Sequence, residues 1–282
     1  MTYRELYRRG VTALENSGCE SPEPEMRELM SFCFGISRYS PGLFNDEEPD
    51  EEKLRSFERA LSLRAEGRPL QYITGNWSFM DVELRVGEGV LIPRDDTEVC
   101  VRELLRRLEN DCPAEIADLC SGSGAIALAL AKRYPRTHIT AIELSDKAFE
   151  YLTYNINHNG AGNADPVKGN ILDLWQDYPE EFFDAVISNP PYIPSGELPS
   201  LQKEVLFEPE MALDGGNDGY DFYRIIAERW ISRLKSGGYL SLEIGEGQGE
   251  YVSALLEKSG MTDIRIIYDL GGLERTVSAV RL

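Results

Sequence analysis

Residues 115–131 read EIADLCSGSGAIALALA, and this segment is the strongest indication of the fold. Residues 115–120 have the short apolar pattern of a buried strand, and 124–134 have the alanine-rich composition of a helix. The turn between them contains only small residues, which lets the backbone approach a ligand closely. A strand that passes through a glycine-rich turn into a helix predicts an open α/β sheet with a ligand site at that turn.

The alternation of strand and helix continues from about residue 95 to residue 282. It predicts a doubly wound, Rossmann-like sheet with helices on both faces. Only Gly271 to Arg275 separate the last two strands, which is too short for a parallel crossover, so we expect the last of seven strands to be antiparallel. The predicted strands are 115–120, 138–144, 165–170, 182–189, 238–245, 262–270 and 276–282, and the predicted helices are 98–109, 124–134, 146–159, 218–235 and 248–259.

The region before this sheet lacks a strand pattern. Helical apolar spacing, stopped by Gly18, Gly35 and Gly67, predicts a small helical bundle over residues 1–75. Two short strands, 77–86 and 90–93, are expected around the glycines of the intervening GEG. The predicted organisation is therefore a bundle (1–75), a β-hairpin linker (76–94) and an α/β domain (95–282).

Composition and charge exclude several classes of protein. The 29 Lys and Arg against 49 Asp and Glu give a net charge of −20, which repels a nucleic-acid backbone. The five cysteines are scattered without a CxxC pair, so neither a disulfide framework nor a zinc site is expected, and a reducing cytosol is the natural compartment. No apolar run of about 18 residues and no secretion signal is visible, which predicts a cytoplasmic protein without a membrane partner.

The glycine-rich turn is followed by a second cofactor signal. Glu143 comes nineteen residues after Gly124, at the end of the next predicted strand, where a carboxylate can accept hydrogen bonds from two ribose hydroxyls. Backbone N–H groups at the helix start suit a small carboxylate, such as that of a methionine moiety. The rival cofactor, NAD, prefers a GxGxxG loop that is absent here. S-adenosylmethionine is the cofactor that this combination favours.

Residues 188–192, SNPPY, end the fourth predicted strand, at the edge where open α/β sheets bind ligands. The side-chain oxygen of Asn189 and the carbonyl of Pro190 can each accept one N–H of a planar amide or amine. That arrangement orients a poorly nucleophilic nitrogen and stabilises the positive charge that develops on it. The prolines hold the two acceptors rigidly, and Tyr192 can stack on the planar group. The alternative is a proline-rich turn without chemistry.

Six segments in order and spacing carry a resemblance that covers nearly the whole chain. The chain resembles the peptide-chain release factor glutamine N5-methyltransferases of the HemK/PrmC type. The segments are PLQYITGNWSFM (69–80), VLIPRDDTE (90–98), DLCSGSGAIALALA (118–131), SNPPYIP (188–194), EPEMALDGGNDGYDFY (208–223) and GGYLSLEIGEGQ (237–248).

The resemblance implies a substrate, a cofactor and a set of site residues. It implies methylation of the Gly-Gly-Gln glutamine of class 1 release factors with S-adenosylmethionine and without a metal, and a bundle that helps to bind the factor. The glutamine would be held by Asn189, Pro190, Pro191 and Tyr192, with Asn189, Pro190 and Tyr192 catalytic. The cofactor would be lined by Cys120, Ser121, Gly122, Ser123, Gly124, Glu143, Asn170, Ile171 and Asn189.

The chain departs from the family pattern at several positions, and the motifs also allow other functions. Cys120 stands where glycine is commoner and Glu143 where aspartate is frequent, while Asp95-Asp96 replaces a usual Pro-Glu and leaves the roles of Arg94 and Glu98 open. The principal alternative is a nucleic-acid adenine N6-methyltransferase, which would share the site. A non-catalytic binding protein and an NAD oxidoreductase fit the motifs less well.

Overall fold

The computed structural model describes residues 1–41, 45–108 and 114–282. These residues form two compact units, each with a hydrophobic core of its own. The first unit consists of Met1–Asn76 with Gln202–Phe207, and the second of Trp77–Leu201 with Glu208–Leu282.

The first unit is the predicted helical bundle. Its helices are α1 (Tyr3–Asn16), α2 (Pro22–Phe34), α3 (Glu51–Ala65) and the short α4 (Leu70–Thr74), which the sequence did not indicate. A capping box of Thr2 and Glu5 begins α1, and Gly35, with φ 70°, ends α2 in the left-handed conformation that glycine adopts readily. Leu6, Met30 and Phe57 are fully buried where the three longer helices meet.

A separate segment of the chain completes this unit. Gln202–Phe207 lies 126 residues beyond Asn76 in the sequence but packs with the bundle. The Arg64 guanidinium binds both Glu25, in α2, and Glu204, in the returning segment, the latter at 3.0 Å. Arg64 is buried, so its positive charge needs the stabilisation that these two carboxylates provide.

The second unit contains the predicted seven-stranded sheet. Its order is β5-β4-β3-β6-β7-β9-β8. The pairs from β5 to β7 are parallel, and β9 lies antiparallel between β7 and β8. The strands are β3 (Glu115–Leu119), β4 (His138–Glu143), β5 (Ala164–Lys168), β6 (Phe183–Ser188), β7 (Leu234–Glu243), β8 (Met261–Tyr268) and β9 (Glu274–Arg281). The predicted fold class, with its antiparallel last strand, is confirmed.

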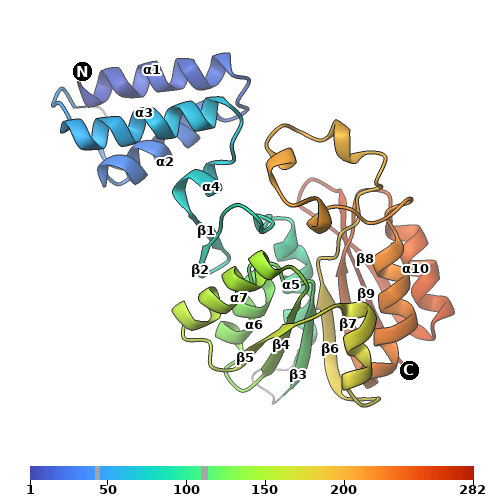
Figure 1. Ribbon diagram of the computed structural model, residues 1–282. Helices are drawn as coiled ribbons and strands as arrows, with labels where there is room; N and C mark the ends of the chain where they lie inside the picture. The colour runs from blue at the N-terminus through green and yellow to red at the C-terminus, as the bar shows by residue number, and fades with distance from the viewer. Residues whose placement is uncertain (42–44, 109–113) are drawn as a thin grey trace. The chain divides into compact units, whose positions relative to one another are not determined.

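Helices cover both faces of this sheet (Figure 1). Alternate strand residues point to opposite sides: Ile116 and Ile187 belong to one apolar core, and Ala117 and Val186 to the other. The first core packs under α5, α6 and α7, and the second under α9 and α10. The helices are α5 (Thr97–Arg107), α6 (Ala125–Arg133), α7 (Asp146–His158), α8 (Ile171–Leu174), α9 (Asp221–Ile225) and α10 (Gly249–Lys258). Among the helices of the described residues, none has the length and apolar composition that crossing a membrane requires.

Two predicted elements differ from the structure. The hairpin consists of β1 (Asn76–Phe79) and β2 (Val82–Arg85), so its turn lies at Met80 rather than at the GEG glycines. Residues 90–93 form no strand, because the Ile92 N–H donates to the Glu208 carboxylate instead of to a neighbouring strand.

The predicted helix over 218–235 is not one continuous α-helix. Only α9 is α-helical; a π-helical turn follows at Ile226–Trp230 and a 3₁₀ turn at Ile231–Arg233. The segment ends where the Arg233 side chain donates to the Tyr178 carbonyl, and β7 begins at the next residue.

Candidate active site

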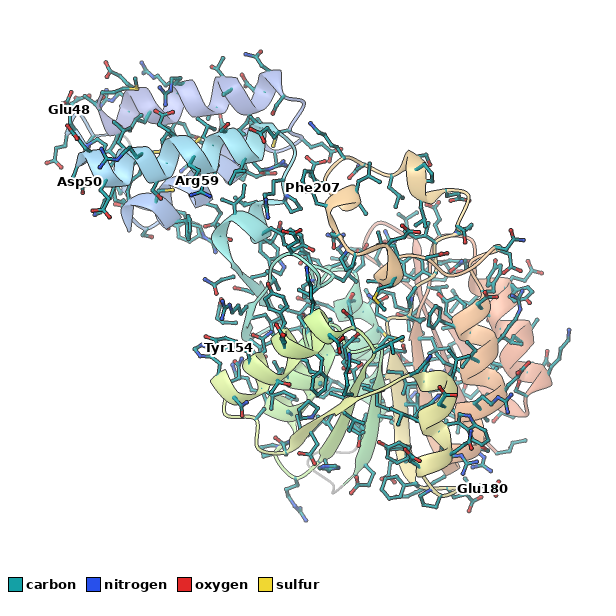
Figure 2. The ribbon with its side chains drawn as sticks, in the orientation of Figure 1. Glu48, Asp50, Arg59, Tyr154, Glu180 and Phe207 are labelled. Atoms are coloured by element: carbon teal, nitrogen blue, oxygen red, sulfur yellow. The ribbon has the colours of Figure 1, made fainter. Side chains whose placement is uncertain are left out.

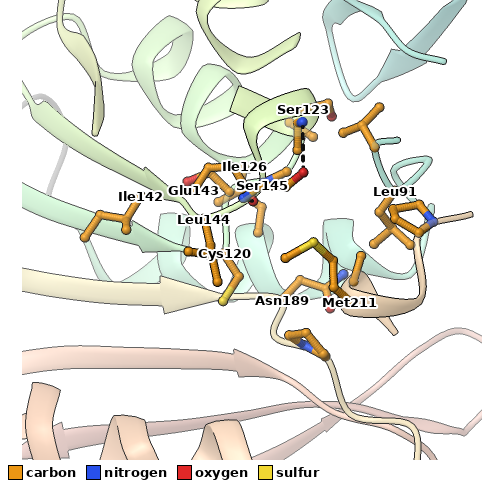
Figure 3. A pocket seen from close by; sticks show the side chains of 18 of the residues that line it. Leu91, Cys120, Ser123, Ile126, Ile142, Glu143, Leu144, Ser145, Asn189 and Met211 are labelled. Carbon is orange, nitrogen blue, oxygen red and sulfur yellow. Dashed lines mark hydrogen bonds between the residues drawn. The ribbon is translucent and has the colours of Figure 1, made fainter. Parts of the chain in front are cut away.

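One pocket of the second unit lies at the carboxyl ends of β3, β4 and β6, and Figure 3 shows Cys120, Glu143, Asn189 and Met211 around it. Its volume is about 910 Å³ when the open solvent at its mouth is included. The predicted site residues that line it are Cys120, Ser121, Gly122, Ser123, Glu143, Asn170, Ile171, Asn189 and Pro191. Gly124, Pro190 and Tyr192 do not line this pocket.

The glycine-rich turn is held by short hydrogen bonds. Ser121 donates from its hydroxyl to the Asp118 carbonyl at 2.8 Å, and the Gly124 N–H donates to the Ser121 carbonyl at 2.8 Å. Gly122 has φ 56°, and a methyl group placed there would meet no atom within 4 Å. The turn therefore leaves space beside Gly122, where the backbone can lie close to a ligand.

Cys120 begins the turn in an unusual conformation. Its φ of 60° lies in the left-handed region, which glycine occupies without strain. This conformation explains why glycine is the expected residue at the first position of such a loop. Burial raises the pKa of the Cys120 thiol, and the carboxylates of Glu143 and Asp118 raise it further. A neutral thiol is a poor nucleophile, so Cys120 acts as a small side chain of the pocket lining.

Glu143 ends β4 with its carboxylate at the pocket, although the residue is 8% exposed. One oxygen accepts the Gly122 N–H at 2.8 Å, and the other accepts the Ser145 N–H at 2.6 Å. Each carboxylate oxygen can accept more than one hydrogen bond, so the group can still bind a ligand hydroxyl. Glu143 thus joins the glycine-rich turn to the start of α7.

Asn170 and Ile171 form the pocket wall at the start of α8. The Asn170 side chain accepts the Leu172 N–H at 3.0 Å and caps this short helix. Ile171 is buried, and its carbonyl accepts a hydrogen bond from the Trp230 indole. Asn170 therefore fixes the start of α8, and Ile171 gives this wall an apolar side chain that suits the face of a planar ring.

The NPPY turn follows β6 directly. Ser188 anchors the strand end by donating to the Leu119 carbonyl at 2.7 Å, and the Asn189 side-chain nitrogen donates to the Thr97 hydroxyl at 3.1 Å. The Tyr192 carbonyl accepts a hydrogen bond from the Gln248 side chain at 3.0 Å. Burial raises the pKa of the Tyr192 phenol, so this group stays neutral.

The structure also resolves the positions of Arg94 and Glu98. Arg94 forms an ion pair with the buried Glu208, whose carboxylate also accepts the Ile92 N–H at 2.9 Å. This pair joins two segments of the pocket rim. Glu98 pairs with Arg102 one turn along α5, at 2.6 Å, as an ordinary helix-surface charge does.

Several pocket residues escaped the sequence analysis. They lie in the segments that carry the family resemblance, but no periodicity or charge pattern indicates the individual side chains. The residues are Leu91, Pro93, Thr97, Pro209, Met211 and Phe222 in the pocket lining, together with Gln248 behind the NPPY turn.

Comparison with known families adds to this geometry. A model of the "Methyltransferase small domain" matches residues 93–216, and a model of the "PrmC N-terminal domain" matches residues 5–75. A crystal structure of a methyltransferase from Pyrococcus furiosus has a TM-score of 0.52 at 19% identity, over 71% of this chain and 89% of that one. That likeness shows that the two proteins share the fold.

Relatives in sequence are closer. The release factor glutamine methyltransferase of Geobacter sulfurreducens is 37% identical over 94% of this chain and 91% of its own length. The protein of the same name from Moorella thermoacetica is 37% identical over 100% of this chain and 99% of its own. Identity at this level over more than nine tenths of both chains shows that the chain belongs to the release factor glutamine methyltransferase family.

Proposed function

We propose that this protein transfers a methyl group from S-adenosylmethionine to the side-chain amide nitrogen, N5, of the glutamine in the Gly-Gly-Gln motif of class 1 release factors. The observation that carries the proposal is the combination of family membership with a pocket that unites the glycine-rich turn, Glu143 and the NPPY turn. These groups come from the ends of three parallel strands.

The residues present fit the cofactor. The open space beside Gly122 lets the backbone lie close to the methionine moiety, and the Glu143 carboxylate suits the ribose hydroxyls. Asn170 and Ile171 border the space for the adenine. We assign Cys120, Ser121, Ser123, Gly124 and Asn189 to the same cofactor site, with Gly124 acting from behind the lining at the start of α6. When bound, S-adenosylmethionine supplies an electrophilic methyl group on its sulfonium.

Asn189 and Pro190 act on the glutamine. The Asn189 side-chain oxygen and the Pro190 carbonyl each accept one amide N–H, which directs the nitrogen toward the methyl donor and stabilises its developing positive charge. Pro191 keeps the turn rigid, and the Tyr192 ring supports the planar amide. The methylated nitrogen is acidic and loses its proton to water, so neither a histidine base nor a metal is needed.

We also propose a division of labour along the chain. Residues 1–75 recognise the release factor, 76–94 link the two parts, and 95–282 carry the chemistry. The returning segment Gln202–Phe207, which belongs to the compact unit of the bundle, is included in the recognition part. A net charge of −20 favours a protein substrate over nucleic acid.

A mass spectrum of a purified class 1 release factor tests the proposal. After incubation with the enzyme and methyl-labelled S-adenosylmethionine, the label should appear on the Gly-Gly-Gln glutamine, and a chelator should not change the rate. A factor that carries alanine in place of this glutamine is the matched control and should stay unlabelled. Label on adenine in duplex DNA, with none on the factor, would overturn the proposal in favour of an adenine N6-methyltransferase.

A further inference from the structure

Asn189 is useful to the proposed reaction only in one of its two amide orientations. Its oxygen must face the methyl-accepting group, because an NH₂ group in that place would meet the substrate N–H with another donor. Rotation by 180° about the last side-chain bond exchanges the two groups without changing the shape of the side chain. Some other group must therefore distinguish the oxygen from the nitrogen.

Thr97 is the group that contacts the Asn189 amide. Its hydroxyl oxygen accepts the Asn189 Nδ2–H at 3.1 Å, and Thr97 is 3% exposed at the start of α5. A hydroxyl has one proton to donate, so it can face either amide orientation when it is alone. The hydroxyl proton of Thr97 must be donated to a third group, because only then is its oxygen restricted to accepting from the Asn189 NH₂ group.

Glu243 provides the second contact. The register that pairs Ser188 with Leu242 places Asn189 and Glu243 side by side at the ends of β6 and β7. Thr97 lies next to the Glu243 carboxylate, which is 2% exposed and whose pKa the Thr97 hydroxyl lowers. An ionised carboxylate only accepts, so the hydroxyl donates to Glu243 and its oxygen is left to accept from the Asn189 NH₂.

The desolvation cost of burying the Glu243 carboxylate indicates that this group has a function beyond folding. Its second oxygen, Oε2, has no hydrogen-bond partner in the described part of the chain. Burial raises the pKa of Glu243 to about 7 and the charge of Asp96 raises it as well, while the Thr97 hydroxyl and the charges of Arg275 and Arg94 lower it. An apolar residue would avoid this desolvation, so folding alone does not account for a carboxylate here.

We propose that Glu243 and Thr97 are positioning residues that hold the Asn189 amide with its oxygen toward the methyl-accepting nitrogen. The chain of bonds runs from the Asn189 NH₂ to the Thr97 oxygen and from the Thr97 hydroxyl to the Glu243 carboxylate. This inference rests on the proposed function for its consequence in catalysis, whereas the orientation itself is a property of the free protein.

The kinetic test compares Thr97→Val with Thr97→Ser in the full-length enzyme, above the pKa of Glu243. Valine keeps the shape and removes the hydroxyl, so kcat should fall about 10–100-fold while the affinity for S-adenosylmethionine changes less than about 3-fold. Serine restores the hydroxyl and should keep kcat within about 3-fold of wild type. Glu243→Gln should lower kcat as well. The glutamine amide can donate to the Thr97 hydroxyl, which could then donate to the Asn189 oxygen and hold the Asn189 amide in the wrong orientation.

The matched control is Thr153→Val in α7, where the threonine hydroxyl has no hydrogen-bond partner among the residues described. It should leave kcat unchanged. Equal losses in Thr97→Val and Thr97→Ser, or an unchanged kcat in Thr97→Val, would overturn the proposal.

A second readout does not depend on the substrate. In the full-length protein with ¹⁵N-labelled asparagine, the Asn189 side-chain NH₂ signal, assigned by its loss in Asn189→Asp, should shift in Thr97→Val and return toward wild type in Thr97→Ser. An Asn189 signal that is the same in wild type and Thr97→Val would contradict the inference even if the enzyme is active. If the Asn189 signal shifts in Thr97→Val and returns in Thr97→Ser, but the wild-type enzyme methylates no release factor, then only the proposed function fails.

Discussion

Glu143 shows how a single residue of the pocket serves both the backbone and the ligand space. Its carboxylate accepts the N–H groups of Gly122 and Ser145 and also lines the pocket. Asn170 behaves in the same way, since it caps α8 from the pocket wall. Replacing such a residue therefore changes the shape of the site as well as a ligand contact, and the variants have to separate the two effects.

For Glu143→Ala we expect the affinity for S-adenosylmethionine to fall by about 1.5–3 kcal/mol, because charge-assisted hydrogen bonds to the ribose are lost. Glu143→Gln keeps the size of the side chain and one acceptor oxygen, so its loss should be smaller. Calorimetric titration of the two variants and wild type measures the difference. An affinity equal to that of wild type in Glu143→Ala would remove this residue from the cofactor site.

For Asn189→Ala we expect turnover to fall about 10²–10³-fold, since one acceptor aimed at developing charge is removed. Cofactor affinity should change far less. Tyr192→Phe, which keeps the ring and removes only the hydroxyl, is the mild companion variant. Single-turnover rates check both, and an Asn189→Ala enzyme that retains more than about a tenth of wild-type activity would exclude the polarising role.

At the scale of elements, the junction of β3 with α6 contains a buried carboxyl group that is costly to ionise. Asp118 is fully buried; its Oδ2 accepts the Ala127 N–H at 3.2 Å, and its Oδ1 has no partner among the residues that the structure describes. Burial raises the pKa of this carboxyl to about 7. The end of β3 is therefore joined to the start of α6 by the Asp118 carboxyl group, which is costly to ionise.

The pH dependence of unfolding tests this element. The folded-state pKa is raised, so between about pH 4 and pH 7 the folded protein holds a proton that the unfolded chain has lost, and stability declines as pH rises through that window. From pH 5 to pH 8, wild type should lose on the order of 3 kcal/mol of unfolding free energy relative to Asp118→Asn, which does not titrate. Urea unfolding measures both curves.

The control for this prediction is Asp269→Asn. The Leu273 N–H and the Arg275 guanidinium lower the pKa of Asp269, so it stays ionised in both states across the same range. The unfolding free energy of this variant should run parallel to that of wild type from about pH 5 to pH 8. A parallel curve for Asp118→Asn as well would show that the buried carboxyl is not protonated as proposed.

At the scale of the whole molecule, the two compact units have separate cores and separate proposed tasks. The bundle contributes no residue to the pocket lining, and the second unit buries both faces of its sheet with its own helices. Figure 2 shows Glu48, Asp50 and Arg59 among the charged side chains that cover the outside of the bundle.

Deleting residues 1–75 should leave cofactor binding nearly intact and raise KM for a folded release factor, while turnover stays detectable at high substrate concentration. Binding energy that is uniform between ground and transition state is lost, but the groups at the reacting nitrogen remain. A short Gly-Gly-Gln peptide is the control substrate, and its KM should not change. An unchanged KM for the folded factor would assign the bundle a structural role alone.

Local signals in the sequence were enough to predict the strand order along the chain, the antiparallel last strand, the bundle and the two motifs that face one pocket. Periodicity, glycines at positive φ and the short link before β9 act between near neighbours, so they are readable without a structure. The turn at Met80 and the interrupted helix after Ile225 were missed, because neighbouring packing decided them.

Tertiary structure alone decided which distant groups meet. The bond from Asn189 to Thr97 spans 92 residues, and that from Ile92 to Glu208 spans 116. The partnership of Arg64 with Glu204 depends on a segment that returns to the bundle. Such contacts leave no periodic trace in either segment, since each depends on how whole layers pack, and a side chain's hydrogen-bond direction is set by its neighbours in space.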